Sequence, residues 1–433
     1  MPVEPVPPAH QGRSPGGDAC PGALRLHSAA DGALARIRIP AGLLTSRQAI
    51  ALADAADDLG DGHFDLTSRG NLQLRGLASG CGAELGARLR GAGLLPSDRH
   101  DRVRNVAASP LCGLDGQGMG ADVQRWARTL DALLCSHEDR LPELSGLSGR
   151  FLFGLDDGRG DITALSPDVT LIATSHGRAA LRLAATGPAL ELAAEDAPRA
   201  ALLAAAEFLA VLRTSGIQAW RIHELPRELL PAAETLAARL AIAGIATTPL
   251  PRFQPPHGSP PRPGMVTAPD HTPSLSVAAP LGRLTTAQWR LLADVAGRDE
   301  LRVTPWRGIV LPGTDGDLLP RLAAAGLVTS ADSPWHRAGA CAGRPGCAKS
   351  LADVRADAAA CLASARPGEP GGPVPLPVYW SGCERRCGHP ADGDWVDVLA
   401  TGDGYRVTAG GRTTTVASSD LAGAVATARI PTR

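Results

Sequence analysis

The sequence predicts an α/β protein built from two related halves. Two stretches with the same order of helix, strand and Arg-Gly signals begin at Pro40 and at Pro280. A proline-rich segment, residues 249–274, separates them and is typical of a linker between folded halves. Roughly 150 residues of mixed helix and strand pattern follow the first copy, and roughly 100 residues follow the second.

The two copies share a capping box, a glycine after the helix and an Arg-Gly pair in the next strand signal. In the first copy these are Thr45 with Gln48, Gly60 and Arg69-Gly70; in the second they are Thr285 with Gln288, Gly297 and Arg307-Gly308. Such agreement in order, spacing and caps indicates an internal duplication. Each copy is expected to begin with a small strand–helix–strand unit.

The remaining elements are predicted from hydrophobic periodicity. We expect helices over 122–135 and 196–214, and strands at 150–155 and 169–173. The resulting division is a flexible tail at 1–21, a small unit at 22–98, an α/β domain at 99–248, the linker at 249–274, a second small unit at 275–333 and a C-terminal domain at 334–433.

Composition excludes several classes of function. Lys+Arg is 43 against Asp+Glu 44, so there is no basic excess for general nucleic-acid binding. Aromatic residues are 3% of the chain, too few for a base-stacking surface. The longest apolar stretch, residues 200–212, is too short to span a membrane, and no signal-peptide pattern opens the chain. We therefore expect a cytoplasmic protein without a membrane partner.

Four of the nine cysteines form two pairs, Cys341-x5-Cys347 and Cys383-x3-Cys387. Four thiolates suit an iron–sulfur cluster or zinc, and the five-residue gap is wider than zinc sites usually have. A helical pattern begins at 348, and its N-terminus is expected to face an anionic cluster. The other cysteines are expected to be ordinary buried residues: Cys20, Cys81, Cys112, Cys135 and Cys361.

The cysteine pattern, C-x5-C followed by S-G-C-x3-C, resembles the cluster motif of the nitrite/sulfite reductase family. The phrase FDLTSRGNLQLRGL is similar to the ferredoxin-like half-domain of that family. The resemblance implies an internally duplicated reductase-like fold, with two ferredoxin-like half-domains and two larger mixed α/β domains. It also implies a 4Fe-4S cluster held by Cys341, Cys347, Cys383 and Cys387.

Several polar side chains are predicted to share one strand face. Alternation places Arg36 and Arg38 together, with Ile37 and Ile39 on the other face. A solvated strand face is the simpler alternative for any one arginine. The family resemblance instead implies that such positions bind the carboxylates of a tetrapyrrole. The candidates are Arg36, Arg38, Arg69, Asn71, Gln73, Arg75, Arg104, Arg150 and Arg307.

Within the family, the phrases TPWRGIVL and SGCERRCGHP resemble the precorrin-3B synthases. This implies an oxygen-dependent monooxygenase of aerobic cobalamin biosynthesis, acting on precorrin-3A and dioxygen with an external electron donor. It further implies a mononuclear non-haem iron beside the cluster, whose ligands the sequence does not identify. No catalytic acid or base is assigned.

Two alternatives stay open. A sirohaem-dependent sulfite or nitrite reductase would use a basic–Phe–basic strand for its oxyanion, and here the match reads Arg150-Phe151-Leu152. The leucine weakens that hypothesis, because reduction of an oxyanion consumes many protons. A non-enzymatic tetrapyrrole carrier or electron-transfer protein is the second alternative.

Overall fold

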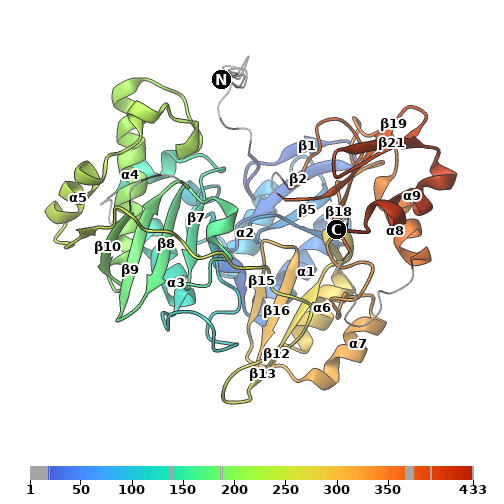
Figure 1. The fold of residues 1–433 in the computed structure, drawn as a ribbon, viewed down its shortest axis with the longest axis horizontal. Coiled ribbons are helices and arrows are strands. Elements are labelled where there is room, and N and C mark those ends of the chain that lie inside the picture. Colours follow the sequence, from blue (N-terminus) through green and yellow to red (C-terminus); the bar gives the residue numbers. More distant parts are fainter. Residues whose placement is uncertain are drawn as a thin grey trace.

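The computed structural model describes residues 18, 20–136, 141–185, 187, 189–365, 375–390 and 393–431. Within these residues the strands form four sheets. In Figure 1 the two sheets of the repeated units lie in the middle, with the green domain on one side and the red C-terminal domain on the other. The predicted fold class, a duplicated α/β protein, is confirmed.

The two repeated units exchange edge strands. The first sheet has the order β1 (His27–Ala29), β2 (Gly32–Ile37), β5 (Leu72–Leu77), β4 (His63–Leu66) and β14 (Arg283–Thr285). The second has the order β12 (Gly264–Thr267), β13 (Pro273–Ala278), β16 (Gly308–Pro312), β15 (Leu301–Val303) and β3 (Leu43–Leu44). Thus β14 of the second copy completes the first sheet, and β3 of the first copy completes the second. Each strand covers an otherwise unpaired edge, so the halves are interlocked.

The duplication is visible in atomic detail. Helix α1 (Ser46–Leu59) and helix α6 (Thr286–Asp294) both begin with the predicted capping box. The amide of Gln48 donates to the Ala92 carbonyl at 3.2 Å, and the amide of Gln288 donates to the Ala325 carbonyl at 2.8 Å. The two helices pack together, and the Trp289 indole donates to the Ala49 carbonyl of α1. Helices α2 (Gly82–Gly91) and α7 (Leu319–Ala324) complete the two units.

The second repeated helix ends earlier than predicted. The sequence indicated an end at Gly297, whereas α6 ends at Asp294 and Val295 is its C-cap. The Thr314 hydroxyl donates to the Val295 carbonyl at 3.2 Å and accepts from the Gly297 amide at 3.0 Å. Thr314 lies 17 residues after Gly297. Its side chain therefore binds the Val295 carbonyl and the Gly297 amide, two groups that a longer helix would have used for its own hydrogen bonds.

The larger first domain is a sheet with helices packed on it. Its strand order is β11 (Thr248–Pro249), β10 (Ala189–Ala193), β9 (Arg178–Leu183), β8 (Val169–Thr174), β7 (Phe153–Asp156) and β6 (Val106–Ala108). Its helices are α3 (Val123–Cys135), α4 (Ala197–Ser215) and α5 (Ala233–Ile242). These elements confirm both predicted helices and the strand at 169–173. The strand predicted from 150 begins at Phe153, because a turn joins the Phe151 amide to the Ser148 carbonyl.

The C-terminal domain has a five-stranded sheet and two helices. The sheet runs β17 (Ala338–Ala340), β18 (Val378–Ser381), β19 (Val396–Thr401), β20 (Gly404–Ala409) and β21 (Arg412–Val416). The helices are α8 (Val354–Ser364) and α9 (Leu421–Ala428). The helix predicted from 348 was placed too early, since Asp353 caps α8 and accepts from the Ala356 amide. A turn at Cys347 and Ser350 occupies the preceding residues instead.

The predicted tail and linker both touch folded domains. Residues 1–17 and 19 of the tail lie outside the described part, but Asp18 accepts from the Gly149 amide at 2.6 Å. The segment 249–274 contains β12, and its Pro256 carbonyl accepts from the Thr163 hydroxyl at 3.1 Å. None of the described helices is long and apolar enough to cross a membrane.

A buried carboxyl group in the first domain makes stability depend on pH. Asp161 is 1% exposed, and its Oδ1 accepts from the Ser109 hydroxyl at 2.6 Å. Burial, with Asp156 nearby, raises the pKa of Asp161 from 3.8 to about 7. The folded chain therefore holds a proton that the unfolded chain has released, so this group lowers stability as the pH rises from about 4 to 7.

Replacing Asp161 with asparagine is expected to remove this loss. Relative to the unmodified protein, Asp161→Asn should gain little stability near pH 4 and up to about 4 kcal/mol at pH 8. Urea unfolding of both proteins at pH 5 and pH 8 measures the difference. A gain of equal size at both pH values would contradict the expectation.

Candidate active site

A polar row crosses the first sheet on the face away from its helices. In the strand register Arg36 lies opposite Gln73, Gln73 opposite Asp65, and Asp65 opposite Arg283. Directly opposed residues point to the same side of a sheet. The predicted alternation is confirmed, because Ile37 and its apolar neighbours fill the core against α1. This face therefore gathers polar and charged side chains from four strands.

Three arginines converge at one end of this face. Arg38 and Arg69 donate to the Gly149 carbonyl at 3.1 and 3.4 Å. Arg36 and Arg38 both donate to the sulfur of Cys20, at 3.5 and 3.2 Å. Across the described residues, none of these three arginines makes an ion pair with a carboxylate. Asp101 near Arg38 and Asp168 near Arg69 still act on these charges from a greater distance, and the binding of an anionic ligand here stays a prediction.

The pKa values of Arg38 and Arg69 are both lowered. Burial, with Arg221 and Arg38 nearby, lowers the pKa of Arg69 to about 10. Burial also lowers the pKa of Arg38, which is 2% exposed. Crowded, desolvated cations gain free energy when an anion neutralises them. The structure brings together Arg36, Arg38 and Arg69 as the sequence predicted, and adds Cys20, which the sequence treated as an ordinary buried residue.

Cys20 was missed because its surroundings come from distant segments. From the sequence, Cys20 was expected to be an ordinary buried residue, and its Pro/Gly-rich neighbourhood contains nothing that would indicate another role. Its amide donates to the Asp18 carboxylate at 3.0 Å, and its thiol lies 3.6 Å from the Gly149 carbonyl. These contacts place the end of the predicted tail on the arginine face.

Arg75 links the same face to the cysteine-bearing domain. It forms a bidentate pair with Asp31, at 2.7 and 2.9 Å, and donates to the Gly346 carbonyl at 2.5 Å. Gly346 precedes Cys347, so the first repeated unit contacts the cysteine loop. Beside it lies a cavity of about 630 Å³, whose lining includes Arg75, Gly346 and Arg355.

A second ion-pair group fixes the C-terminal domain on this sheet. Asp65 accepts from Arg283 at 2.9 Å and from Arg355 of α8 at 3.0 Å. Burial by itself would raise the pKa of Asp65, but Arg355 and Arg283 lower it below its usual value. The cysteine domain is thereby anchored over the polar row.

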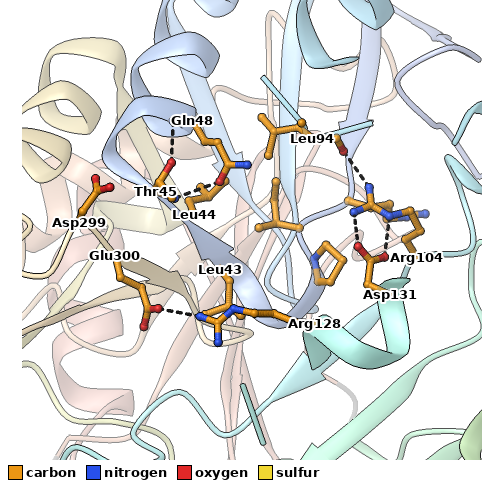
Figure 2. A pocket seen from close by; sticks show the side chains of 14 residues that line it. Leu43, Leu44, Thr45, Gln48, Leu94, Arg104, Arg128, Asp131, Asp299 and Glu300 are labelled. Carbon is orange, nitrogen blue, oxygen red and sulfur yellow. Dashed lines mark hydrogen bonds and ion pairs between the residues drawn. The ribbon is translucent and has the colours of Figure 1, made fainter. Parts of the chain in front are cut away.

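Arg104 faces a different environment from the other candidates. Figure 2 shows its guanidinium in a bidentate pair with Asp131 of α3, with both distances 2.7 Å. It also donates to the Leu94 carbonyl at 2.8 Å. Asp131 on α3 and the Leu94 carbonyl, which follows α2, thus bind all three guanidinium nitrogens of Arg104. The contacts give Arg104 a structural task at the boundary of the first two domains.

Asn71 and Arg150 lie next to the three converging arginines but have other contacts. The buried Asn71 side chain accepts a hydrogen bond from the Ile39 amide at 3.0 Å and donates one to the Asn105 side chain at 2.8 Å. Arg150 is exposed, and its guanidinium lies 4.2 Å from the ring centre of Trp220. A role for either in ligand binding stays a prediction.

Leu152 lies in an apolar cluster. It is 2% exposed and packs with Ala107 and Ile162, and Trp306 of the second repeated unit closes the cluster. Its backbone amide donates to Asp168 at 2.8 Å. A basic side chain at this position would be buried among apolar groups, so the leucine fits its surroundings.

The motif cysteines lie at one end of the C-terminal sheet. Cys341 follows β17 and Cys383 lies two residues after β18, and these two strands are parallel neighbours. The Cys341 amide donates to the Trp380 carbonyl at 3.0 Å, and the Gly382 amide donates to the Cys341 sulfur at 3.2 Å. A backbone amide that points at a cysteine sulfur is the kind of contact that stabilises a metal-bound thiolate.

The cysteine loops are also joined to each other. The Leu351 amide donates to the Gly382 carbonyl at 2.8 Å, and a side chain at position 382 would collide with Ser350. No three His, Cys, Asp or Glu side chains in the described ranges converge on a single ion position. Each iron of a cubane takes its own thiolate, so its ligands stand farther apart than those of one ion. A 4Fe-4S cluster held by the four motif cysteines stays a prediction.

Three of the remaining cysteines behave as the sequence predicted. Cys112 is 7% exposed, and its thiol donates to the Ala121 carbonyl at 3.2 Å. Burial raises the pKa of Cys112 to about 11 and that of Cys135 to about 12. Cys361 packs against the C-terminal core. Because burial keeps them protonated, these thiols are expected to be unreactive.

Comparison with known proteins agrees with the geometry. The family profile described as nitrite/sulfite reductase ferredoxin-like half domain matches residues 27–89 and 268–326, the two repeated units. At those residues the chain carries two copies of this half domain. This confirms the resemblance inferred from the sequence motifs.

Individual members of the family differ in how much of this chain they match. Ferredoxin–nitrite reductase of Synechococcus elongatus is 28% identical over 394 residues, covering 83% of this chain and 75% of that protein. The chloroplastic ferredoxin–nitrite reductase of Zea mays is 26% identical over 388 residues, covering 82% and 67%. Precorrin-3B synthase of a Sinorhizobium species is 46% identical, but over 61 residues, or 14% of this chain and 13% of that protein.

The fold is also that of a solved structure. The NirA protein of Mycobacterium tuberculosis superposes with a TM-score of 0.63 over 90% of this chain and 79% of its own, at 17% identity. At this identity the likeness establishes the fold of the chain and carries no information on its substrate.

Proposed function

We propose that this protein is an oxidoreductase that acts on a tetrapyrrole carrying many carboxylates. The observation that carries the proposal is the cluster of Arg36, Arg38 and Arg69 on the polar face of the first sheet, with none of them in an ion pair with a carboxylate among the described residues. Guanidinium groups bind carboxylates in a fork geometry, so such a face suits a ligand with several of them. Arg75 connects this face to the cysteine loop.

Within that class, we propose a precorrin-3B synthase. Leu152 supports this choice, because its apolar surroundings supply no charge to a small oxyanion. The reaction would hydroxylate precorrin-3A at the meso carbon between rings A and D and close a lactone with the ring A acetate. One oxygen atom of dioxygen enters the macrocycle, the other leaves as water, and an external donor provides two electrons.

The residues of the chain have defined tasks in this proposal. Cys341, Cys347, Cys383 and Cys387 would hold a 4Fe-4S cluster, which supplies electron transfer when bound. Arg36, Arg38 and Arg69 would fix the carboxylates and thus the orientation of the macrocycle, a positioning role that contributes strongly to catalysis. For the mononuclear iron, the described residues offer no converging set of three ligands, so no step is assigned to it.

A sirohaem-dependent nitrite or sulfite reductase is the second candidate. The extent of the matches favours it, since the ferredoxin–nitrite reductases align over more than four-fifths of this chain. In that case the same arginines would hold the carboxylates of sirohaem.

The absorption spectrum of anaerobically purified protein, with an acid–acetone extract, separates the two candidates. We expect broad iron–sulfur absorbance without extractable sirohaem, and oxygen-dependent turnover of precorrin-3A. One sirohaem per chain would overturn the synthase proposal in favour of the reductase. A colourless protein that binds zinc would overturn both.

A further inference from the structure

The sequence pairs Arg307-Gly308 with Arg69-Gly70, but the backbone places Arg307 at the position of Gly70: the amides of Gly70 and Arg307 donate to the Thr67 and Thr304 carbonyls. Arg69 donates to Gly149 in the larger first domain. Arg307 donates to the Gly388 carbonyl at 2.9 Å, directly after the last motif cysteine. Its φ is 59°, whereas in the first copy the left-handed residue is Gly70. An arginine in this conformation indicates that the surrounding contacts determine the turn.

Tyr379 lies against the same loop. It is on β18 and 1% exposed, and its hydroxyl donates to the Cys387 carbonyl at 2.8 Å. The guanidinium of Arg307 lies 5.3 Å from the centre of its ring.

Two glycines permit this close packing. Gly339 of β17 is the direct strand partner of Tyr379, and a Cβ there would lie 2.9 Å from the Tyr379 ring and 3.3 Å from Arg307. Gly388 has φ 84°, and a Cβ there would lie 2.6 Å from the Tyr379 hydroxyl. The side chains of Arg307 and Tyr379 thus fill the space between the sheet and the Cys387 loop.

We propose that Arg307 and Tyr379 are positioning residues that hold the backbone of Cys387 and Gly388, and so fix the Cys387 thiolate for a metal cluster. Cys387 is exposed, whereas the other three motif cysteines are partly buried, so its loop depends most on such a tether. This inference rests on the proposed function. It gives Arg307 a task toward the cysteine loop, whereas Arg69 lies toward the first domain, at the Gly149 carbonyl.

The chain offers a matched control, because it has two tyrosines. Tyr405 is also 1% exposed and in the same domain, but its hydroxyl donates to Asp357 of α8. Tyr379→Phe and Tyr405→Phe each remove one buried hydroxyl. Two measurements compare them: hydrogen exchange of residues 383–390 in the metal-free chain, and the rate of iron loss from the reconstituted protein to a ferrous chelator.

We expect Tyr379→Phe to speed iron loss roughly three- to tenfold, the effect of one hydrogen bond, and to speed exchange of the loop. Arg307→Ala should act in the same direction by about tenfold or more, and Arg307→Lys should restore part of the effect. Tyr405→Phe should leave both rates unchanged, although its midpoint of thermal unfolding falls.

Equal behaviour of the two Phe variants would overturn the inference, as would unchanged loop exchange in Tyr379→Phe. If the unmodified chain takes up no iron, the proposed function and the cluster role both fall. If it loads a cluster and Tyr379→Phe loses iron at the unmodified rate, only the positioning role falls.

Discussion

Serine at position 387 or 383 is expected to abolish both the iron–sulfur absorbance and turnover. A serine oxygen is a poorer ligand for iron than a thiolate, and Cys383 and Cys387 provide half of the motif. Because changes to groups outside the ligand set already cost about 10–100-fold, loss of a ligand should lower activity by more than about a hundredfold. Iron and sulfide content, the visible spectrum and oxygen-dependent turnover measure the effect.

Cys361→Ser is the matched control for these variants. Cys361 lies on α8 in the same domain and packs against the core. We expect the Cys361→Ser variant to keep its cluster and to lose only a little stability. Turnover that survives the loss of the cluster in Cys387→Ser would disprove an electron-transfer role for the four cysteines.

Arg36→Ala is expected to weaken tetrapyrrole binding with little effect on folding. Arg36 is half-buried and bonds Gln73 at 3.2 Å and Cys20 at 3.5 Å, so its charge is the least committed to other groups of the chain. A charge-assisted contact to a carboxylate is worth about 1.5–3 kcal/mol, so affinity should fall roughly 10- to 150-fold. Titration with a carboxylate-rich tetrapyrrole, followed by absorbance, gives the dissociation constant.

Two other arginines provide the contrast. Arg178→Ala removes a partly exposed strand arginine paired with Glu191 and should leave the affinity unchanged. Arg104→Ala leaves Asp131 without its partner and should lower the free energy of unfolding by about 3–5 kcal/mol. If Arg36→Ala binds the tetrapyrrole as well as Arg178→Ala does, the arginine face is not the ligand site.

The local elements of the fold were largely predictable from the sequence. Capping boxes at Thr45 and Thr285 fixed the starts of α1 and α6, because a cap depends on residues three positions apart. Apolar periodicity located α3 and α4. The errors occurred where a distant group intervened, as when Thr314 ended α6 before Gly297.

The exchange of edge strands was not predictable in the same way. Strand β3 has two residues and β14 has three, too few to show a period. Their partners, β15 and β4, lie in the other copy. Only the packed structure therefore shows that the two repeated units are interlocked.

The sequence by itself determined the duplication, the four motif cysteines and the strand face on which Arg36 and Arg38 lie. These features depend on spacing along the chain, which fixes caps, turns and side-chain alternation. The tertiary structure decided which arginines remain without a carboxylate. Alternation sets the direction of a side chain, but the charge opposite it comes from elements far away in sequence. Asp131 therefore neutralises Arg104, Arg307 donates to the Gly388 carbonyl, and Arg38 and Arg69 donate to the Gly149 carbonyl without an ion pair to a carboxylate among the described residues.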